Sequence, residues 1–251
     1  MADNSQEIKR HKGIYLLPNL FTTAGLFAGF FAIVAAMDGR FEAAAVAVFI
    51  AMVMDGIDGR IARLTNTQSD FGKEYDSLAD MISFGIAPAL VIYTWALQSM
   101  GKIGWLAAFL YTAAAALRLA RFNTQVDTVD KGFFQGLSSP AAAALLMGMV
   151  WVGADYQVKG EAYAILAFVL TVAAGLLMVS NVRYHSFKNF DLKGKVPFVA
   201  ILVVVLIFVF ISISPSHVLF AMAFVYAVSG VVLTLWRLRG KQGSRSGVSK
   251  K

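Results

Sequence analysis

Eight long apolar stretches are the feature that most constrains what this chain can fold into. An α-helix needs about 20 predominantly apolar residues to cross a bilayer, and each stretch is close to that length. The stretches lie at 16–37, 41–62, 77–99, 103–122, 139–156, 161–181, 197–214 and 217–236. Only 15% of the residues are charged, whereas a soluble domain usually carries about a quarter. The sequence therefore predicts an all-α integral membrane protein with about eight transmembrane helices.

Two further features refine this expectation. The first apolar stretch follows a polar, basic segment and is not followed by a small-residue cleavage site, so we expect it to remain as the first membrane helix. Pro88 lies inside the third stretch and is expected to kink it, because proline removes a backbone donor and clashes with the preceding turn. The chain has no cysteine, which excludes disulfides and thiolate chemistry.

The basic residues are distributed very unevenly between the two sides of the membrane. With the N-terminus in the cytoplasm, 19 of the 22 Lys and Arg residues fall on the inner side. The three on the outer side are Arg40, Lys102 and Lys159. Such a bias is the positive-inside signal of membrane proteins, and it explains the net charge of +7 without a nucleic-acid partner. It also places two longer loops, 122–138 and 182–196, on the cytoplasmic side.

Six of the fifteen acidic residues are concentrated between Met54 and Met81. Asp55 and Asp58 are three residues apart at the inner end of the second stretch, and Asp76 and Asp80 are four apart at the inner end of the third. Both spacings put a pair on one helix face. Because the second helix runs inward and the third outward, the two pairs are expected to face each other at one membrane depth.

Four carboxylates this close would repel one another unless a cation neutralised them. Carboxylate oxygens suit hard divalent ions such as Mg²⁺ or Mn²⁺. Gly56 and Gly59 would let a ligand approach the backbone, Arg60 and Arg63 would attract a phosphate, and Gly72 is expected in the loop between the helices. Ionisable groups at the membrane indicate a functional site, here a cation and phosphate site at the cytoplasmic face.

The same segment resembles the signature of the CDP-alcohol phosphatidyltransferase family, D-x2-D-G-x2-A-R-x8-G-x3-D-x3-D. Every spacing of the signature is intact in this chain. The residues that match it are Asp55, Asp58, Gly59, Ala62, Arg63, Gly72, Asp76 and Asp80. The resemblance implies a two-metal aspartate site that transfers a phosphatidyl group from CDP-diacylglycerol to an alcohol.

The resemblance also implies a role for each matching residue. Asp55, Asp58 and Asp76 would be metal ligands, and Asp80 would lie beside the metals and act as the general base for the incoming hydroxyl. The residues implied to line the cytidine diphosphate pocket are Gly59, Ala62, Arg63 and Gly72. Asn19 and Thr22, at the inner start of the first stretch, are expected to touch the nucleotide.

Other segments indicate the acceptor. "YDSLADMISFGIAPALVIY", "ALRLARFN", "FQGLSSPAAA" and "VSNVRYHSFK" are similar to segments of bacterial family members that use L-serine, giving phosphatidylserine and CMP. One departure is that Ser138 stands where that pattern has proline. A serine carboxylate needs a cation near the metals. The candidates are Arg118, Arg121, Asn123 and Arg183, although the arginines also fit ordinary positive-inside anchors.

The expected organisation is a cytoplasmic segment (1–15), a family core (16–190), two additional helices (191–236) and a basic disordered tail (237–251). We expect a bacterial inner-membrane enzyme with both termini and the active site in the cytoplasm, and the resemblance implies a homodimer. Two alternatives remain open. One is a sister enzyme that uses another alcohol, such as glycerol 3-phosphate or inositol phosphate. The other is a transporter whose carboxylates bind cations, although transporter sites usually lie near the midplane on broken helices.

Overall fold

The computed structural model describes residues 16–65, 67, 69–124, 133–185 and 198–246. Each of the eight predicted stretches is helical in it, which confirms the all-α membrane class. The main helices are α1 (Leu16–Met37), α2 (Phe41–Leu64), α3 (Asp70–Asp80), α4 (Ala87–Trp95), α5 (Lys102–Thr124), α6 (Ser139–Asp155), α7 (Ala164–Val179), α8 (Phe198–Ile213) and α9 (Pro215–Ser246). The shorter helical turns are η2 (Met81–Ile86), η3 (Leu97–Met100) and η4 (Gly160–Tyr163).

Five helical stretches within the described residues are long and apolar enough to cross a membrane. They are Pro18–Met37, Asp70–Trp95, Lys102–Thr124, Gly160–Val179 and Pro215–Thr234. The apolar helix α6 is shorter, and α2 carries Asp55, Asp58, Arg60 and Arg63 in its second half. Helix α2 is therefore not among these five stretches, and it is the helix that carries Asp55 and Asp58.

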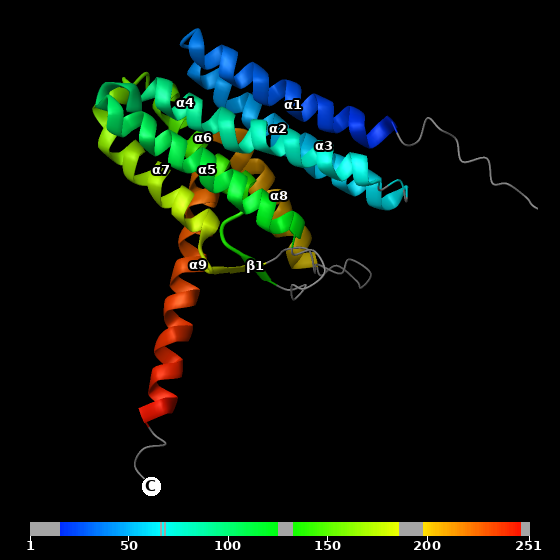
Figure 1. The fold of residues 1–251 in the computed structure, drawn as a ribbon, viewed down its shortest axis with the longest axis vertical. Coiled ribbons are helices and arrows are strands. Elements are labelled where there is room, and N and C mark those ends of the chain that lie inside the picture. The colour runs from blue at the N-terminus through cyan, green and yellow to red at the C-terminus, as the bar shows by residue number, and fades with distance from the viewer. Residues whose placement is uncertain (1–15, 66, 68, 125–132, 186–197, 247–251) are drawn as a thin grey trace, which may run out of the picture.

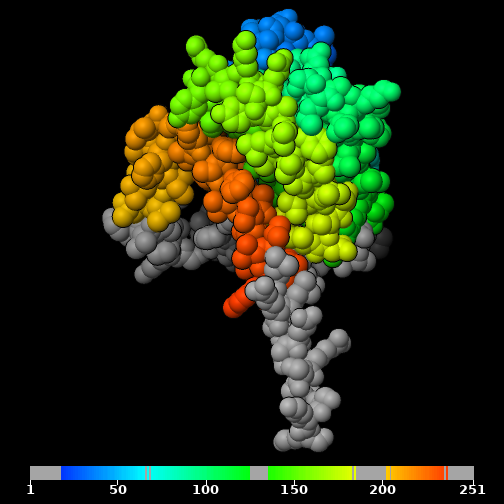
Figure 2. All heavy atoms as spheres, turned by 90° about the vertical axis from the view of Figure 1, so that its left-hand side faces the viewer, coloured from blue at the N-terminus to red at the C-terminus, as the bar shows by residue number. Residues whose placement is uncertain are grey.

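The helices form a bundle in which α1, α2 and α3 lie along one side (Figure 1). Helix α9 packs on α6, and α8 packs mainly on α9 at the edge of the bundle (Figure 2). Helix α9 also continues to Ser246, so the irregular tail expected from residue 237 is helical as far as that residue. The physical reason is that Leu, Arg, Lys and Gln favour helix and cations near a helix C-terminus are stabilised by its dipole.

Small residues let α1 approach its neighbours closely. Ala28, Ala32 and Ala35 on α1 are buried, and a Cβ added to Gly29 would lie 2.6 Å from Ser83 Oγ and 2.8 Å from Ser83 Cα. The Ser83 hydroxyl donates a hydrogen bond to the carbonyl of Gly25 at 3.1 Å. Close backbone approach at small residues is the usual basis of helix packing in membranes, so here the Gly25–Gly29 pair packs within one chain.

The predicted kink at Pro88 takes the form of a wide helical turn. Residues Met81–Ile86 form the π-helix η2, and Pro88 lies in the first turn of α4. Proline cannot donate to the carbonyl four residues earlier, which is that of Phe84. The buried hydroxyl of Tyr111 donates a hydrogen bond to this carbonyl at 3.0 Å. The bond satisfies a backbone acceptor for which lipid offers no donor.

A two-stranded antiparallel pair, which the sequence reasoning missed, joins the two long loops. Strands β1 (Phe133–Gln135) and β2 (Arg183–His185) pair with Phe134 opposite Tyr184. Residues 125–132 and 186–197 lie outside the described residues. Because β1 and β2 pair, the ends of both loops lie on the same side of the bundle, as the charge pattern predicts.

Substituting Gly29 tests the close packing between α1 and η2. We expect Gly29→Ala to lower the thermal stability of the purified protein in detergent, because overpacking costs about 1–3 kcal/mol. Gly25→Ala is the matched control on the same helix, since its added Cβ would meet only ordinary contacts, 3.6 Å from Met54 Cβ and 3.7 Å from the Ala51 carbonyl oxygen. Equal melting temperatures for the two variants would contradict this packing.

Candidate active site

The four aspartates lie on two helices that meet through a short connection. Asp55 and Asp58 are on α2, and Asp76 and Asp80 are on α3. Helix α3 begins seven residues before the predicted third stretch, so Gly72 lies in its first turn and not in a loop. The reason is an N-cap: the Ser69 hydroxyl accepts a hydrogen bond from the Gly72 amide at 3.0 Å, an arrangement that stabilises helix starts.

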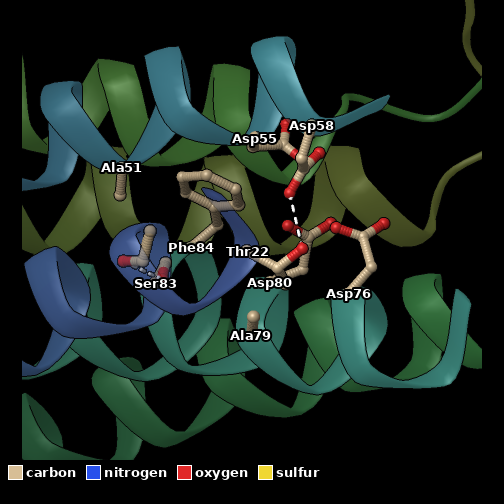
Figure 3. Close-up of a pocket in the computed structure, with 10 residues that line it drawn as sticks. Thr22, Ala51, Asp55, Asp58, Asp76, Ala79, Asp80, Ser83 and Phe84 are labelled. Carbon is tan, nitrogen blue, oxygen red and sulfur yellow. Dashed lines mark hydrogen bonds between the residues drawn. The ribbon is translucent and has the colours of Figure 1, made fainter. Parts of the chain in front are cut away.

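The carboxylates converge as the helix-face argument predicts (Figure 3). Asp55, Asp76 and Asp80 each offer an oxygen atom within 4.8 Å of the others. Asp58 is buried, and its Oδ2 accepts a hydrogen bond from Thr22 Oγ1 at 2.8 Å. Thr22 is on α1, so a third helix fixes the orientation of the fourth carboxylate.

A cavity of about 10 Å³ lies among these side chains, lined by all four aspartates together with Thr22 and Ser83 (Figure 3). This volume is about enough for one water-sized ligand. Carboxylate oxygens at this separation are the donor set that Mg²⁺ and Mn²⁺ prefer. The residues present therefore fit a divalent metal site, and a cation there would offset the repulsion among the carboxylates.

A larger cleft of about 710 Å³ adjoins this cavity and shares Thr22, Asp58 and Asp76 with it. It is lined by every residue that was predicted to contact the nucleotide. These are Asn19, Thr22, Gly59, Ala62, Arg63 and Gly72. Arg60, which we expected to attract phosphate together with Arg63, is exposed and lines neither the cavity nor the cleft.

The cleft also contains residues that the sequence reasoning missed. They are Pro18, Thr67, Ser69, Asp70, Lys73 and Phe122. Thr67, Ser69, Asp70 and Lys73 occupy variable positions of the signature, so the motif gave no reason to select them. Their position in the first turn of α3 or just before it would have indicated them, because helix starts present free amides to anions.

Gly72 is a position of the cleft where a side chain would be tightly packed. A Cβ added to Gly72 would lie 3.1 Å from Ser69 Oγ and 3.4 Å from Asn19 Oδ1. The absence of a side chain therefore keeps the α1 and α3 walls of the cleft close together at this point. By contrast, Gly56 has open space where a Cβ would lie.

The structure separates the four residues proposed to contact the acceptor. Arg118 donates a hydrogen bond to Ser139 Oγ at 2.9 Å and lies close enough to Asp80 for their charges to interact. Asn123 donates to Ser77 at 2.9 Å, next to Asp76. Arg118 is thus linked to the acidic cluster by charge, and Asn123 is linked to the helix that carries Asp76 and Asp80.

Arg121 points to a different set of partners. It donates hydrogen bonds to the side-chain oxygens of Gln135 and of Asn181, the latter at 3.0 Å. Arg183 is on β2 opposite Gln135, and its side chain lies outside the described residues. Ser138, which replaces the proline of the resembled pattern, is the N-cap of α6 and accepts from the Ala141 amide at 3.4 Å, so this departure preserves the helix start.

Comparison with known proteins agrees with the motif and the geometry. The family model for CDP-alcohol phosphatidyltransferase matches residues 15–179. The chain belongs to the CDP-alcohol phosphatidyltransferase family. The family match covers α1 to α7 and includes all four aspartates and the cleft, whereas α8 and α9 lie beyond it.

Several curated relatives are similar over most of their length. A CDP-diacylglycerol–serine O-phosphatidyltransferase of Helicobacter pylori (strain ATCC 700392 / 26695) is 38% identical over 89% of this chain and 92% of the relative. Proteins with the same name from Methanocaldococcus jannaschii and Bacillus subtilis (strain 168) are 33% and 32% identical, over 74% and 69% of this chain and 81% and 92% of the relatives. This member of the family is thus similar to enzymes named for serine as acceptor.

The hydrogen bond from Thr22 to Asp58 can be tested separately from the carboxylates. We expect Thr22→Val to weaken Mn²⁺ binding roughly tenfold, because loss of an outer-shell partner typically costs 10–100-fold in metal affinity. Isothermal titration of Mn²⁺ into the purified protein measures this. Thr23→Val is the neighbouring control, since the Thr23 hydroxyl donates to the Asn19 carbonyl and pairs with the Tyr75 hydroxyl. Unchanged affinity in the Thr22 variant would show that Asp58 needs no such support.

Proposed function

We propose that this chain transfers the phosphatidyl group of CDP-diacylglycerol to the hydroxyl of L-serine, giving phosphatidylserine and CMP. The observation that carries the proposal is that four signature aspartates line one cavity, which adjoins a cleft lined by all six residues predicted to contact the nucleotide. The similarity to serine-named relatives over most of the chain supports serine over other alcohols.

Asp55, Asp58, Asp76 and Asp80 would hold two divalent ions, Mg²⁺ or Mn²⁺. Such ions, when bound, neutralise the pyrophosphate and stabilise the leaving nucleotide in an in-line displacement. Asp55, Asp76 and Asp80 offer converging oxygens, while the hydrogen bond from Thr22 holds Asp58 toward the cleft side of the cluster.

The cleft residues would bind the cytidine diphosphate part of the donor. Gly59 leaves the α2 backbone open beside Arg63, whose guanidinium would pair with phosphate oxygens. Asn19 and the region around Gly72 form the opposite wall. Arg63 and Lys73 contribute positive charge to this cleft, which suits a pyrophosphate.

Asp80 would act as the general base. The serine oxygen forms a bond to the phosphorus of the phosphatidyl group, the bond from this phosphorus to the CMP oxygen breaks, and the serine hydroxyl proton moves to the Asp80 carboxylate. A positioned carboxylate of this kind accelerates such a step by about 10²–10⁴-fold. Asp80 is suited to this role because its carboxylate lies in the cluster that would hold the metals.

Arg118 would bind the carboxylate of serine. It is the arginine whose charge interacts with that of Asp80, so a serine bound there would place its hydroxyl near the base. Asn123 would contribute to serine binding through its contact with α3. Arg121 and Arg183 would contribute to serine binding from the adjoining β1–β2 region.

The membrane setting suits a lipid substrate. Helices α1 and α3, which border the cleft, expose large apolar side chains such as Leu20, Phe27, Phe71 and Leu78. Acyl chains of the donor would lie against such surfaces while the head group enters the cleft from the side. We further propose an inner-membrane location with the site and both termini in the cytoplasm, a homodimer, and the division into a core at 16–190 followed by two additional helices.

Release of CMP with different acceptors tests this function. Purified protein with CDP-diacylglycerol and Mn²⁺ should release CMP when L-serine is supplied, and a chelator should stop the release. Glycerol 3-phosphate and inositol phosphate should give little or none, because the acceptor side offers a guanidinium for a carboxylate rather than a cluster of cations for a phosphate. Mass spectrometry of the lipid product identifies the alcohol.

Asp80→Asn is the matched variant in this assay. Its turnover should fall at least about 100-fold while binding of the donor persists, because the cleft is lined by other residues. Release with glycerol 3-phosphate or inositol phosphate instead of serine would identify a sister enzyme. No release with any acceptor from folded, metal-loaded protein would overturn the enzymatic proposal in favour of cation transport.

A further inference from the structure

The cleft of about 710 Å³ extends beyond the residues that would hold the pyrophosphate. At the end that would hold the metals it is lined by Asp58 and Asp76, which also line the small cavity. From Asp58, helix α2 runs on to its last residue, Leu64, over about 9 Å. The cleft then continues to Thr67 and Ser69 in the connection to α3. With its phosphates at the metal end, a nucleotide would place its base at this connection.

Thr67 is a buried polar side chain at this end of the cleft, with 8% of its surface exposed. Its Oγ1 lies 2.7 Å from Thr65 Oγ1, and Thr65 Oγ1 in turn donates a hydrogen bond to the Ile61 carbonyl oxygen at 2.7 Å. A hydroxyl has only one proton to donate. Because the Ile61 carbonyl takes the proton of Thr65, the bond between the two hydroxyls forms only when Thr67 is the donor.

This chain of hydrogen bonds gives the Thr67 hydroxyl a single role toward the cleft. Its proton points at Thr65, which leaves the lone pairs of its oxygen, and no described residue donates to them. A hydroxyl fixed in this way accepts a hydrogen bond from a ligand but does not donate one. Thr65 itself is exposed and is not among the residues that line the cleft, so it would act on a ligand through Thr67.

Ser69, two residues further along the chain, offers the opposite role. As the N-cap of α3, its Oγ accepts a hydrogen bond from the Gly72 amide at 3.0 Å. The cap uses a lone pair of the hydroxyl and leaves its proton unused, and no acceptor for this proton lies among the described residues. Ser69 lines the same cleft. This end of the cleft therefore presents an acceptor from Thr67 and a donor from Ser69.

An acceptor beside a donor is complementary to cytosine and not to uracil. The edge of cytosine carries the N4 amine, which is a donor, next to the ring nitrogen N3, which is an acceptor. Uracil carries the acceptor O4 in place of the amine and an N–H donor at N3, so both roles are reversed. The Thr67 hydroxyl cannot donate to O4 while Thr65 holds its proton.

We propose that Thr67 and Ser69 recognise the cytosine base of the donor, and that Thr65 is a positioning residue that holds Thr67 as an acceptor. Thr67 Oγ1 would accept from the N4 amine, and the Ser69 hydroxyl would donate to N3. The proposal rests on the proposed function, because it assigns the base to the same donor cleft. It adds that residues at variable positions of the signature select the nucleotide.

Titration of CDP and of UDP into the purified full-length protein with Mn²⁺ tests this recognition. The two probes carry the same ribose and pyrophosphate, so the ratio of their affinities reports on the base. Wild type should bind CDP at least about tenfold more tightly than UDP, and Thr67→Val should bind CDP about tenfold more weakly and lose most of this preference. Valine has the shape of threonine and keeps the hydrogen bond from the backbone amide at position 67 to the Ala62 carbonyl, so the variant should fold.

Thr65→Val separates positioning from direct contact. Without the Thr65 oxygen, the Thr67 proton is free to turn to the cleft and donate to O4 of uracil. The affinity for UDP should therefore rise, while that for CDP stays within about threefold of wild type. A purely structural role of Thr65 would not raise the affinity for UDP.

Thr124→Val is the matched control. Thr124 also donates to the carbonyl four residues earlier near the end of a helix, but it lines neither the cleft nor the small cavity. Its substitution should change neither affinity by more than about twofold.

Three results would overturn the inference. One is equal affinity of wild type for CDP and UDP. Another is a Thr67→Val variant that binds Mn²⁺ and keeps the wild-type preference for CDP. The third is an equal loss of CDP and UDP affinity in Thr67→Val, since Thr67 would then act on the fold or on the ribose. An unchanged preference in Thr65→Val would remove the positioning role of Thr65.

Failure of the inference is distinguishable from failure of the proposed function. If wild type releases no CMP with serine but prefers CDP and loses this preference in Thr67→Val, the proposed function fails and base recognition stands. If wild type makes phosphatidylserine and Thr67→Val keeps the preference, only the inference is overturned. Wild type that binds neither nucleotide would contradict both.

Discussion

Repulsion among four carboxylates at the junction of α2 and α3 is the constraint on which the rest of the structure depends. Two pairs on facing helices put Asp55, Asp76 and Asp80 within 4.8 Å of one another. Such a cluster persists only if the helices are held together and a cation can offset the charge. The small residues of α1 supply the first condition, since they bring α2, α3 and η2 against one helix.

Much of the fold and of the acidic site could be predicted because both depend on patterns between residues that are close in the sequence. Apolar stretches of membrane-spanning length mark the helices, and spacings of three and four place Asp55 with Asp58 and Asp76 with Asp80 on helix faces. The signature predicted four residues of the donor cleft and the start of the first stretch predicted Asn19 and Thr22, and all six share one cleft. Whether those residues contact a nucleotide stays a prediction.

The features that could not be predicted depend on contacts between distant segments. The wide turn before Pro88 is completed by Tyr111 from α5, and the β1–β2 pair joins loops about 50 residues apart. Gly72 lies in the first turn of α3 rather than in the predicted loop, because Ser69 caps the helix start. The arginines three residues apart on α5 also looked equivalent, but Arg118 lies by Asp80 whereas Arg121 contacts Gln135 and Asn181.

The most direct test of the central claim is to count Mn²⁺ ions bound to the purified protein by electron paramagnetic resonance. We expect two ions per chain with broadening from their mutual coupling, and loss of that coupled signal in Asp76→Asn. Glu74→Gln, on the exposed side of the same helix, should keep it. Equal binding by both variants, or no binding by wild type, would contradict the assignment of the aspartate cluster as a two-metal centre.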